Sequence, residues 1–157
     1  MSAVFETQAD GLRGMTVEDL DAVIQIEEAV YPFPWTRGIF HDCIRVGYQC
    51  DVYQKNGEIL AYSVLSIAAG EAHLLTLCVA PEHQNMGFGR MMLQNTIDEA
   101  LFSNVQTVLL EVRPSNLQAI HLYQLMDFTE VGIRPDYYPD ENGREDALIM
   151  ARELFAD

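Results

Sequence analysis

The stretch at residues 73–90, HLLTLCVAPEHQNMGFGR, decides the fold of this chain. Its first part, residues 74–79, is apolar and carries no charge, which is typical of a strand buried on both faces. Pro81 has no N–H to donate to a sheet, so the strand ends before it. Helical periodicity follows from about residue 90 to residue 102. The apolar face of this predicted helix consists of Leu93, Ile97 and Leu101, spaced i, i+4, i+8.

The loop between this strand and helix has the composition of an anion-binding site. Gly87 and Gly89 lack a Cβ, so a ligand can approach the main chain closely. The unpaired N–H groups and the dipole at the start of the helix both favour an anion. The spacing therefore indicates a phosphate or pyrophosphate site, with an ordinary turn as the alternative. No Gly-Lys-Ser/Thr follows, which excludes a P-loop, and the Gly-x-Gly-x-x-Gly of dinucleotide-binding folds is absent.

The length and composition of the chain predict one globular domain. Its 157 residues are enough to bury a core, and 49% of them are hydrophobic. No repeats or linkers are present, so we expect a single domain at 1–157, in which residues 1–14 are a loose lead-in or a short edge strand. No apolar run is long enough to cross a bilayer, and the N-terminus lacks the pattern of a signal peptide. We therefore expect a cytoplasmic protein with no membrane partner.

The charge and the cysteines restrict the possible partners. The net charge of −15 argues against nucleic acid as a direct partner. An acidic surface attracts a basic polypeptide or an amine. The alternative is that the charge only maintains solubility. The three cysteines (Cys43, Cys50 and Cys78) show no metal-ligand spacing, so we expect reduced thiols and no metal. A nucleophilic Cys78 is the less favoured alternative to a small buried hydrophobe.

The first half of the chain predicts two helices and a hairpin. Thr16 and Asp19 have capping-box spacing and begin a helix that extends to about residue 31. The Pro-Phe-Pro-Trp sequence at 32–35 ends it, and a second helix covers about residues 36–46. Asn56-Gly57 is a strong hairpin signal. The two strands that it joins are predicted at 48–55 and 58–67.

Two side chains of this half are candidates for substrate contact. Glu27 lies on the apolar stripe of the first helix, either as a carboxylate at a frayed helix end or as an acid that faces a cleft and holds a substrate cation. For Glu27 we favour the interpretation as a carboxylate at a frayed helix end. Trp35 lies in a proline-stiffened loop that forms either a wall against the substrate or a plug of the core.

Glu111 is the residue in clearest conflict with its local pattern. It lies in a second apolar strand at 105–112, which a right-handed crossover makes parallel to the strand at 74–79. On that strand Glu111 shares a face with Leu109. A carboxylate there is costly unless a cleft solvates it or it is hydrogen-bonded, and such conflicts tend to mark functional sites. The alternative is a strand-end carboxylate that pairs with Arg113 or Arg90.

The last third of the chain completes a mixed sheet. Ser115 and Gln118 have capping-box spacing and begin a helix to about residue 126. A strand at 128–134, a turn-rich loop at 136–143 and a final strand at 145–154 follow. The predicted fold class is therefore α/β, or α+β, with a mixed sheet of six to seven strands and about four helices.

The pattern Gln84-x-x-Gly87-x-Gly89 after an apolar strand resembles the acetyl-CoA pyrophosphate loop of the GCN5-related N-acetyltransferases, the GNAT family. The order of the predicted elements from Thr16 onward is also similar to that family. Within it, the chain resembles the bacterial enzymes that acetylate the N-terminal alanine of a ribosomal protein. The matches that carry this closer resemblance lie at 33–35 (FPW), 110–116 (LEVRPSN), 122–123 (LY), 137–139 (YYP) and 143–147 (GREDA). Met126-Asp127 departs from the Leu-Gly that is usual in the family.

The resemblance implies a co-substrate, a substrate and a set of site residues. Acetyl-CoA would bind with its pyrophosphate on the amides of residues 85–90 and its pantetheine arm along residues 77–79, where a main-chain N–H near Val79 would polarise the thioester carbonyl. The residues implied to bind acetyl-CoA are Leu77, Cys78, Val79, Asn85, Met86, Gly87, Phe88, Gly89, Arg90 and Asn116. Those implied to contact the ribosomal-protein N-terminus are Trp35, Glu27 and Tyr138. Glu111 would be the general base and Tyr123 the general acid.

The chemistry of amine acetylation is consistent with these two catalytic roles. An α-amine has a pKa of about 8 and must lose a proton before it attacks. A carboxylate in a half-apolar cleft is expected to have its pKa raised toward that task, and a tyrosine hydroxyl can serve the leaving thiolate without a covalent intermediate. Tyr123 as a half-buried core ring and Asn116 as a partner of Ser115 in the helix cap remain the alternatives. No role is assigned to His73, His83 or His121, and the alternative functions are acetylation of another peptide or small amine, or non-catalytic binding of CoA.

Overall fold

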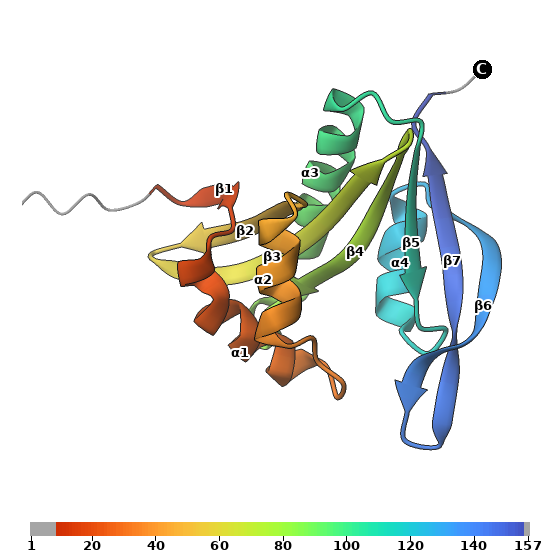
Figure 1. The fold of residues 1–157 in the computed structure, drawn as a ribbon, viewed down its shortest axis with the longest axis horizontal. Coiled ribbons are helices and arrows are strands. Elements are labelled where there is room, and N and C mark those ends of the chain that lie inside the picture. The colour runs from red at the N-terminus through yellow and green to blue at the C-terminus, as the bar shows by residue number, and fades with distance from the viewer. Residues whose placement is uncertain (1–8, 156–157) are drawn as a thin grey trace, which may run out of the picture.

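A seven-stranded mixed sheet forms the centre of the computed structural model, which describes residues 9–155 (Figure 1). The strand order is β1-β2-β3-β4-β5-β7-β6. The strands are β1 (Gly11–Gly14), β2 (Gln49–Lys55), β3 (Glu58–Ala68), β4 (Glu71–Val79), β5 (Thr107–Val112), β6 (Thr129–Asp140) and β7 (Gly143–Glu153). The α-helices are α1 (Leu20–Val30), α2 (Arg37–Arg45), α3 (Phe88–Phe102) and α4 (Leu117–Leu125), with 3₁₀ turns at Val17–Asp19 and Pro81–His83. The predicted fold class is confirmed.

β4 and β5 are parallel neighbours that separate along their length. They are in register from the Glu71–Thr107 pair to the Leu74–Leu110 pair. β4 then continues to Val79 while paired with β3 on its other side. Figure 1 shows the two strands diverging toward their C-terminal ends. The edge of β4 that faces β5 therefore presents backbone groups without a strand partner.

Helices cover both faces of the sheet. On one face α1 and α2 pack against β2, β3 and β4 through fully buried side chains such as Leu20, Val23 and Phe40. On the other face Leu93 and Ile97 of α3 pack, with α4, against β4, β5 and β7. β4 contributes to both apolar cores and β5 only to the second, so the part of β4 that diverges from β5 is held by packing on α1 and α2.

Several boundaries differ from the sequence-based prediction. α3 begins at Phe88 rather than near residue 90, because Gly87 adopts a left-handed conformation and caps it. Leu101 was predicted on the buried stripe but is 39% exposed, and Ala100 is buried instead. With 3.6 residues per turn, the seventh residue after Leu93 returns to its face more closely than the eighth. Residues 136–143 were predicted as a loop but belong mostly to the long β6–β7 hairpin.

The edge-strand alternative holds for part of residues 1–14. Gly11–Gly14 forms β1, antiparallel to β2, whereas residues 1–8 lie outside the described residues. Arg13 anchors this strand by two 2.7 Å hydrogen bonds to the carboxylate of Asp19. The Asp19 carboxylate also accepts a 2.8 Å hydrogen bond from the Thr16 N–H, which confirms the predicted capping interaction.

Three other local predictions are confirmed. Asn56 and Gly57 both have positive φ, 52° and 76°, as the tight turn between β2 and β3 requires. The Thr36 side chain caps α2 by accepting a 3.3 Å hydrogen bond from the Ile39 N–H. Asp127 adopts the left-handed conformation, with φ of 69°, where the family usually has glycine. Among the described residues, no helix combines the length and the apolar character that a membrane span requires.

Candidate functional site

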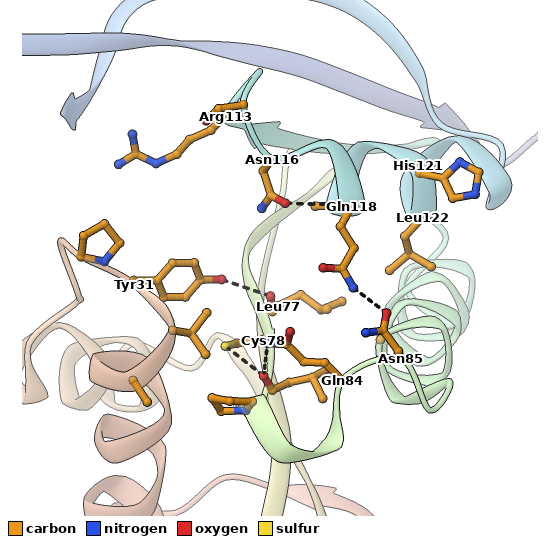
Figure 2. Close-up of a pocket in the computed structure, with 18 of the residues that line it drawn as sticks. Tyr31, Leu77, Cys78, Gln84, Asn85, Arg113, Asn116, Gln118, His121 and Leu122 are labelled. Atoms are coloured by element: carbon orange, nitrogen blue, oxygen red, sulfur yellow. Dashed lines mark hydrogen bonds between the residues drawn. The ribbon is translucent and has the colours of Figure 1, made fainter. Parts of the chain in front are cut away.

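A cavity of about 800 Å³ lies where β4 and β5 diverge (Figure 2). Its wall contains residues from both faces of the sheet. The end of α1 and the loop after it contribute from one side, and the start of α3 together with α4 from the other. Asp140 and Glu141, in the β6–β7 turn, close one end. The cavity therefore passes through the sheet at the gap between the parallel strands.

Most of the predicted acetyl-CoA contacts line this cavity. Those in the wall are Leu77, Cys78, Val79, Asn85, Gly87, Gly89, Arg90 and Asn116. Met86 and Phe88 are outside it. Met86 is largely exposed, and the Phe88 ring packs on the ring of Tyr53 with centroids 5.2 Å apart. Met86 and Phe88 could therefore contact a ligand in the cavity only through their backbone atoms.

The glycine loop presents free donors to the cavity. The first intrahelical hydrogen bond of α3 runs from the Met91 N–H to the Gly87 carbonyl, at 3.1 Å. The N–H groups of the first three residues of α3, which begins at Phe88, therefore have no partner within the helix. At Gly89 a Cβ would lie 3.3 Å from Leu122 Cδ2, so a larger residue would require the Leu122 side chain to shift by a few tenths of an ångström. Backbone donors and the helix dipole together make an anion site here.

Two glutamine side chains brace the loop. Gln84 Nε2 donates to the Val79 carbonyl at 3.2 Å, and Gln118 Nε2 donates to Asn85 Oδ1 at 2.8 Å (Figure 2). Asn85 itself adopts the left-handed conformation, with φ of 63°. The loop is thereby tied to the end of β4 and to α4. Gln118 was predicted as part of a helix cap, and its role as a brace of the loop was missed.

The end of β4 lines the cavity next to Tyr31, a residue that the sequence analysis did not single out. Tyr31 Oη donates a 3.4 Å hydrogen bond to the Leu77 carbonyl (Figure 2). Burial raises the pKa of Tyr31 well above its usual range, so the ring stays a neutral donor. Burial also raises the pKa of Cys78 to about 11, which keeps this residue a thiol. Cys78 therefore has the character of a small buried hydrophobe rather than a nucleophile.

Asn116 and Arg113 contribute from the segment between β5 and α4. Asn116 caps α4 by accepting a 3.2 Å hydrogen bond from the Ala119 N–H, and it also lines the cavity. Ser115, predicted to cap α4, instead donates its hydroxyl to Glu145 Oε1 at 3.0 Å. Arg113, which was not predicted as a site residue, pairs with the same Glu145 oxygen at 3.1 Å.

Arg113 also fixes Tyr138, one of the predicted substrate contacts. The Arg113 guanidinium lies over the Tyr138 ring, 4.5 Å from its centroid. Burial, together with the charges of Tyr137 and Glu111, raises the pKa of the Tyr138 phenol above its usual range. Tyr138 therefore remains a neutral hydroxyl on the same side of the sheet as Glu111.

Glu111 lies beside the cavity rather than in its wall. Its side chain, 9% exposed, is on the face of β5 that carries Leu109. Glu111 Oε2 is 2.5 Å from His73 Nε2, and Oε1 is 3.6 Å from Arg134 Nε. Burial raises the pKa of Glu111, as predicted, but the hydrogen bond and charge of His73 and the charge of Arg134 outweigh it. The pKa therefore lies below its usual range, and the predicted net rise was wrong. The prediction of Arg113 or Arg90 as the arginine partner was wrong, because Arg113 pairs with Glu145 and the arginine beside Glu111 is Arg134.

Tyr123, on α4, points into the apolar core and is 8% exposed. The centroid of its ring is 5.8 Å from that of the Phe128 ring. Burial, and after it the charge of Cys78, raise the pKa of the Tyr123 phenol to about 12. A phenol with so high a pKa keeps its proton at neutral pH and can donate it. Tyr123 does not line the cavity, so its position is that of the core ring given as the alternative to the general acid.

Glu27 is buried, not at a surface helix end as the favoured interpretation expected, and it does not line the cavity. Glu27 Oε1 accepts a 2.6 Å hydrogen bond from Tyr62 Oη, and Oε2 accepts a 2.9 Å hydrogen bond from the Trp35 N–H. Burial raises its pKa, and these two hydrogen bonds oppose the shift. Both oxygens are thus engaged in holding the α1–α2 loop, which does not support a direct contact with a substrate cation. The Trp35 ring packs on Phe40, 5.3 Å between centroids, as the plug alternative predicted.

Known proteins similar to this chain share both its sequence and its fold. The family model described as Acetyltransferase (GNAT) family matches residues 20–128. The [ribosomal protein bS18]-alanine N-acetyltransferase of Escherichia coli K12 is 38% identical over 140 residues, which are 89% of this chain and 95% of that protein. The crystal structure of the ribosomal-protein-S18-alanine N-acetyltransferase from Escherichia coli has a TM-score of 0.87 at 36% identity and covers 95% of this chain and 96% of that chain. The structure of yncA from Salmonella typhimurium with its cofactor acetyl-CoA has the same fold, with a TM-score of 0.79 at 20% identity and coverage of 96% of each chain.

Proposed function

This chain belongs to the GNAT family of acetyltransferases, and we propose that it transfers acetyl from acetyl-CoA to the N-terminal alanine of a ribosomal protein. The substrate is taken from the Escherichia coli relative, whose name states that it acts on ribosomal protein bS18. Such a substrate implies that the enzyme works in the cytoplasm. The observation that carries the proposal is the cavity that crosses the sheet between β4 and β5, because it lets a coenzyme and an amine approach one point from opposite faces.

The residues of the cavity suit acetyl-CoA. The free N–H groups at the start of α3 match a pyrophosphate, and Arg90 in the same wall adds a positive charge. A Cβ at position 89 would crowd the Leu122 side chain between α3 and α4. The unpaired edge of β4 at residues 77–79 offers main-chain groups to the amides of a pantetheine arm. When bound, acetyl-CoA would supply the activated acetyl group.

Glu111 is the proposed general base for the incoming amine. It lies on the face of the sheet that carries His73, and Arg113, two residues later, lines the cavity. Because Glu111 itself is beside the wall, we propose that the proton reaches it through one water molecule, a distance over which general bases act. A carboxylate with a lowered pKa is ionised at neutral pH and so is ready to accept this proton.

Tyr123 is the proposed general acid for the leaving thiolate. Its pKa of about 12 keeps the phenol protonated, and Cys78, at the end of β4, is one of the groups that raise this pKa. Tyr31 and the Leu77 carbonyl fix the opposite side of the gap. Direct transfer with a base on one side and an acid on the other needs no covalent enzyme intermediate, which is consistent with a Cys78 that stays a thiol.

The charge around the cavity suits a positively charged peptide terminus. Asp140, Glu141 and Glu145 line the end formed by the β6–β7 hairpin, and the whole chain has a net charge of −15. Carboxylates at the mouth of a cavity raise the local concentration of an ammonium ion or a basic peptide. We propose that the ribosomal-protein N-terminus enters past these residues and Tyr138.

Release of free thiol from acetyl-CoA tests the proposed function. The chain is incubated with acetyl-CoA and peptides that begin with alanine, serine or methionine, and with an N-terminally blocked peptide that has one internal lysine. We expect release with the alanine peptide and none with the blocked peptide. Equal rates with the lysine peptide would favour a different amine substrate, and no release with any peptide, despite coenzyme binding, would favour a non-catalytic CoA-binding module.

A pair of variants tests the base assignment within the same assay. Glu111→Gln keeps the shape of the side chain but cannot accept a proton, and we expect kcat to fall by about 10²-fold or more. Glu130→Gln makes the same chemical change at an exposed position on β6 and serves as the matched control. Full activity of Glu111→Gln at neutral pH would contradict the assignment.

A further inference from the structure

The outer part of the β6–β7 hairpin, residues 138–145, lies beyond the rest of the sheet, and we call it the outer hairpin. The pairing of β7 with β5 ends at Val112 and Leu148, so among the described residues the outer hairpin has strand partners only within itself. Figure 1 shows the hairpin extending past the C-terminal end of β5. Three acidic side chains of the outer hairpin line the cavity. Its position therefore shapes one end of the cavity.

The ladder between β6 and β7 is interrupted where the outer hairpin begins. Two residues of β6 between Arg134 and Tyr138 have no counterpart on β7. Within this bulge Asp136 adopts the left-handed conformation, with φ of 53°. A bulge disrupts the ladder locally and bends the strand that carries it. The inner part of the ladder therefore does not by itself fix the direction in which the outer hairpin points.

Arg113 provides contacts that can fix this direction. It directly follows the last residue of β5 and lines the cavity. Its Nη1 donates to Glu145 Oε1 at 3.1 Å, and its Nη2 donates to the Pro139 carbonyl at 2.9 Å. The guanidinium also lies over the Tyr138 ring, 4.5 Å from the centroid. One side chain from outside the hairpin thus holds both strands of the outer hairpin.

Glu145 extends this connection to the turn before α4. Its Oε1 accepts a 3.0 Å hydrogen bond from Ser115 Oγ, and its Oε2 accepts a 3.3 Å hydrogen bond from the Ser115 N–H. The next residue, Asn116, caps α4 and lines the cavity. The outer hairpin is therefore joined through Arg113 and Glu145 to the segment that carries Asn116.

We propose that Arg113 is a positioning residue that latches the outer hairpin over the cavity and thereby sets the affinity for the peptide, an inference that rests on the proposed function. Without the latch, the outer hairpin spends only part of its time in the position that completes the peptide end of the site. The apparent affinity for the peptide then falls in proportion to that fraction, whereas the bound complex and its kcat keep their values. The acetyl-CoA contacts on β4 and α3 do not depend on the hairpin.

Two substitutions of Arg113 test the latch in the thiol assay. Arg113→Lys keeps the charge but cannot hold two acceptors and an aromatic face with one planar group, and Arg113→Met removes the charge and every donor. We expect KM for the alanine peptide to rise about 3-fold with lysine and about 10-fold with methionine, while kcat and KM for acetyl-CoA change by less than about 2-fold. Arg144→Met, at an exposed position on β7, is the matched control and keeps wild-type values.

Amide hydrogen exchange, measured by mass spectrometry on the protein without substrates, tests the latch directly. We expect faster exchange at residues 136–145 in Arg113→Met than in the wild type, and unchanged exchange in α3. Arg144→Met should exchange like the wild type in both segments. A local change of this kind separates a latch from a general loss of stability, which would raise exchange in α3 as well.

The other outcomes contradict the latch in distinguishable ways. A raised KM for the peptide with unchanged exchange at 136–145 would show that Arg113 contacts the peptide directly, and would overturn the proposal. Equal rises of both KM values, or wild-type values in Arg113→Met, would overturn it as well. A wild-type protein that releases no thiol with any peptide would refute the proposed function and with it the effect on peptide affinity. Hydrogen exchange needs no turnover, so it tells that failure apart from a failure of the latch.

Discussion

A pair of acidic residues between β2 and α3 predicts an unusual dependence of stability on pH. Asp51 of β2 is 5% exposed and faces Glu99 of α3. Asn95 Nδ2 donates to Asp51 Oδ2 at 3.1 Å and to Glu99 Oε1 at 3.0 Å. Burial, and then the hydrogen bond and charge of Asp51, raise the pKa of Glu99 to about 9. Glu99 therefore keeps its proton in the folded state at neutral pH and loses it on unfolding.

The sign and size of the effect follow from this raised pKa. Between the unfolded pKa of about 4.3 and the folded pKa of about 9, the folded state binds one more proton than the unfolded state, so the free energy of unfolding falls as pH rises. One such proton lowers it by at most about 1.4 kcal/mol for each pH unit, or about 2.7 kcal/mol from pH 5.5 to pH 7.5. Glu99 is partly exposed, and solvent screening reduces the expected loss to roughly 1–2 kcal/mol.

Glu99→Gln removes the titrating group and keeps a donor for Asp51. We expect the free energy of unfolding of this variant to lose about 1–2 kcal/mol less than that of the wild type from pH 5.5 to pH 7.5. Urea unfolding, followed by the fluorescence of Trp35, the single tryptophan, measures the free energy of unfolding of the variant and of the wild type at each pH. Asp98→Asn, at an exposed neighbouring position on α3, makes the same change from carboxyl to amide and serves as control. Parallel pH slopes for Glu99→Gln and the wild type would refute the reasoning.

Three further predictions concern the site. Gly89→Ala places a Cβ 3.3 Å from Leu122 and crowds the contact between α3 and α4. We expect KM for acetyl-CoA to rise about 10-fold in steady-state assays, which corresponds to a loss of about 1.4 kcal/mol of binding free energy, with little change in kcat. Tyr123→Phe removes the proposed acid, and kcat with the alanine peptide should fall by about 10²-fold in the thiol assay while melting changes little; an unchanged kcat contradicts the assignment. Glu27→Gln replaces an acceptor of two hydrogen bonds, and we expect the free energy of unfolding in urea to fall by about 1–3 kcal/mol. We also expect KM to rise more for the peptide than for acetyl-CoA, relative to the wild type.

The local elements of this fold could be predicted because short-range patterns determine them. The apolar run and glycines of residues 73–90 appear as β4, its loop and α3, and Asn56-Gly57 forms the expected tight turn. A helix cap and a coenzyme contact were the two alternatives foreseen for Asn116, and it caps α4 while lining the cavity. In each case the physical cause, a backbone dihedral or a periodic apolar face, lies within a few residues of the signal.

The tertiary structure alone decided which of these residues meet and which are buried. Periodicity placed Glu27 on the apolar side of α1, but only packing showed that Tyr62, 35 residues away, and the Trp35 N–H take both of its oxygens. The same holds for Glu111, whose partner His73 is 38 residues away on a neighbouring strand. Such pairs depend on the register of β4 against β5 and on the point where these strands diverge. Register is a long-range property set by packing on both faces of the sheet, so the sequence by itself determined the elements and the family resemblance, and the folded sheet decided the shape of the site.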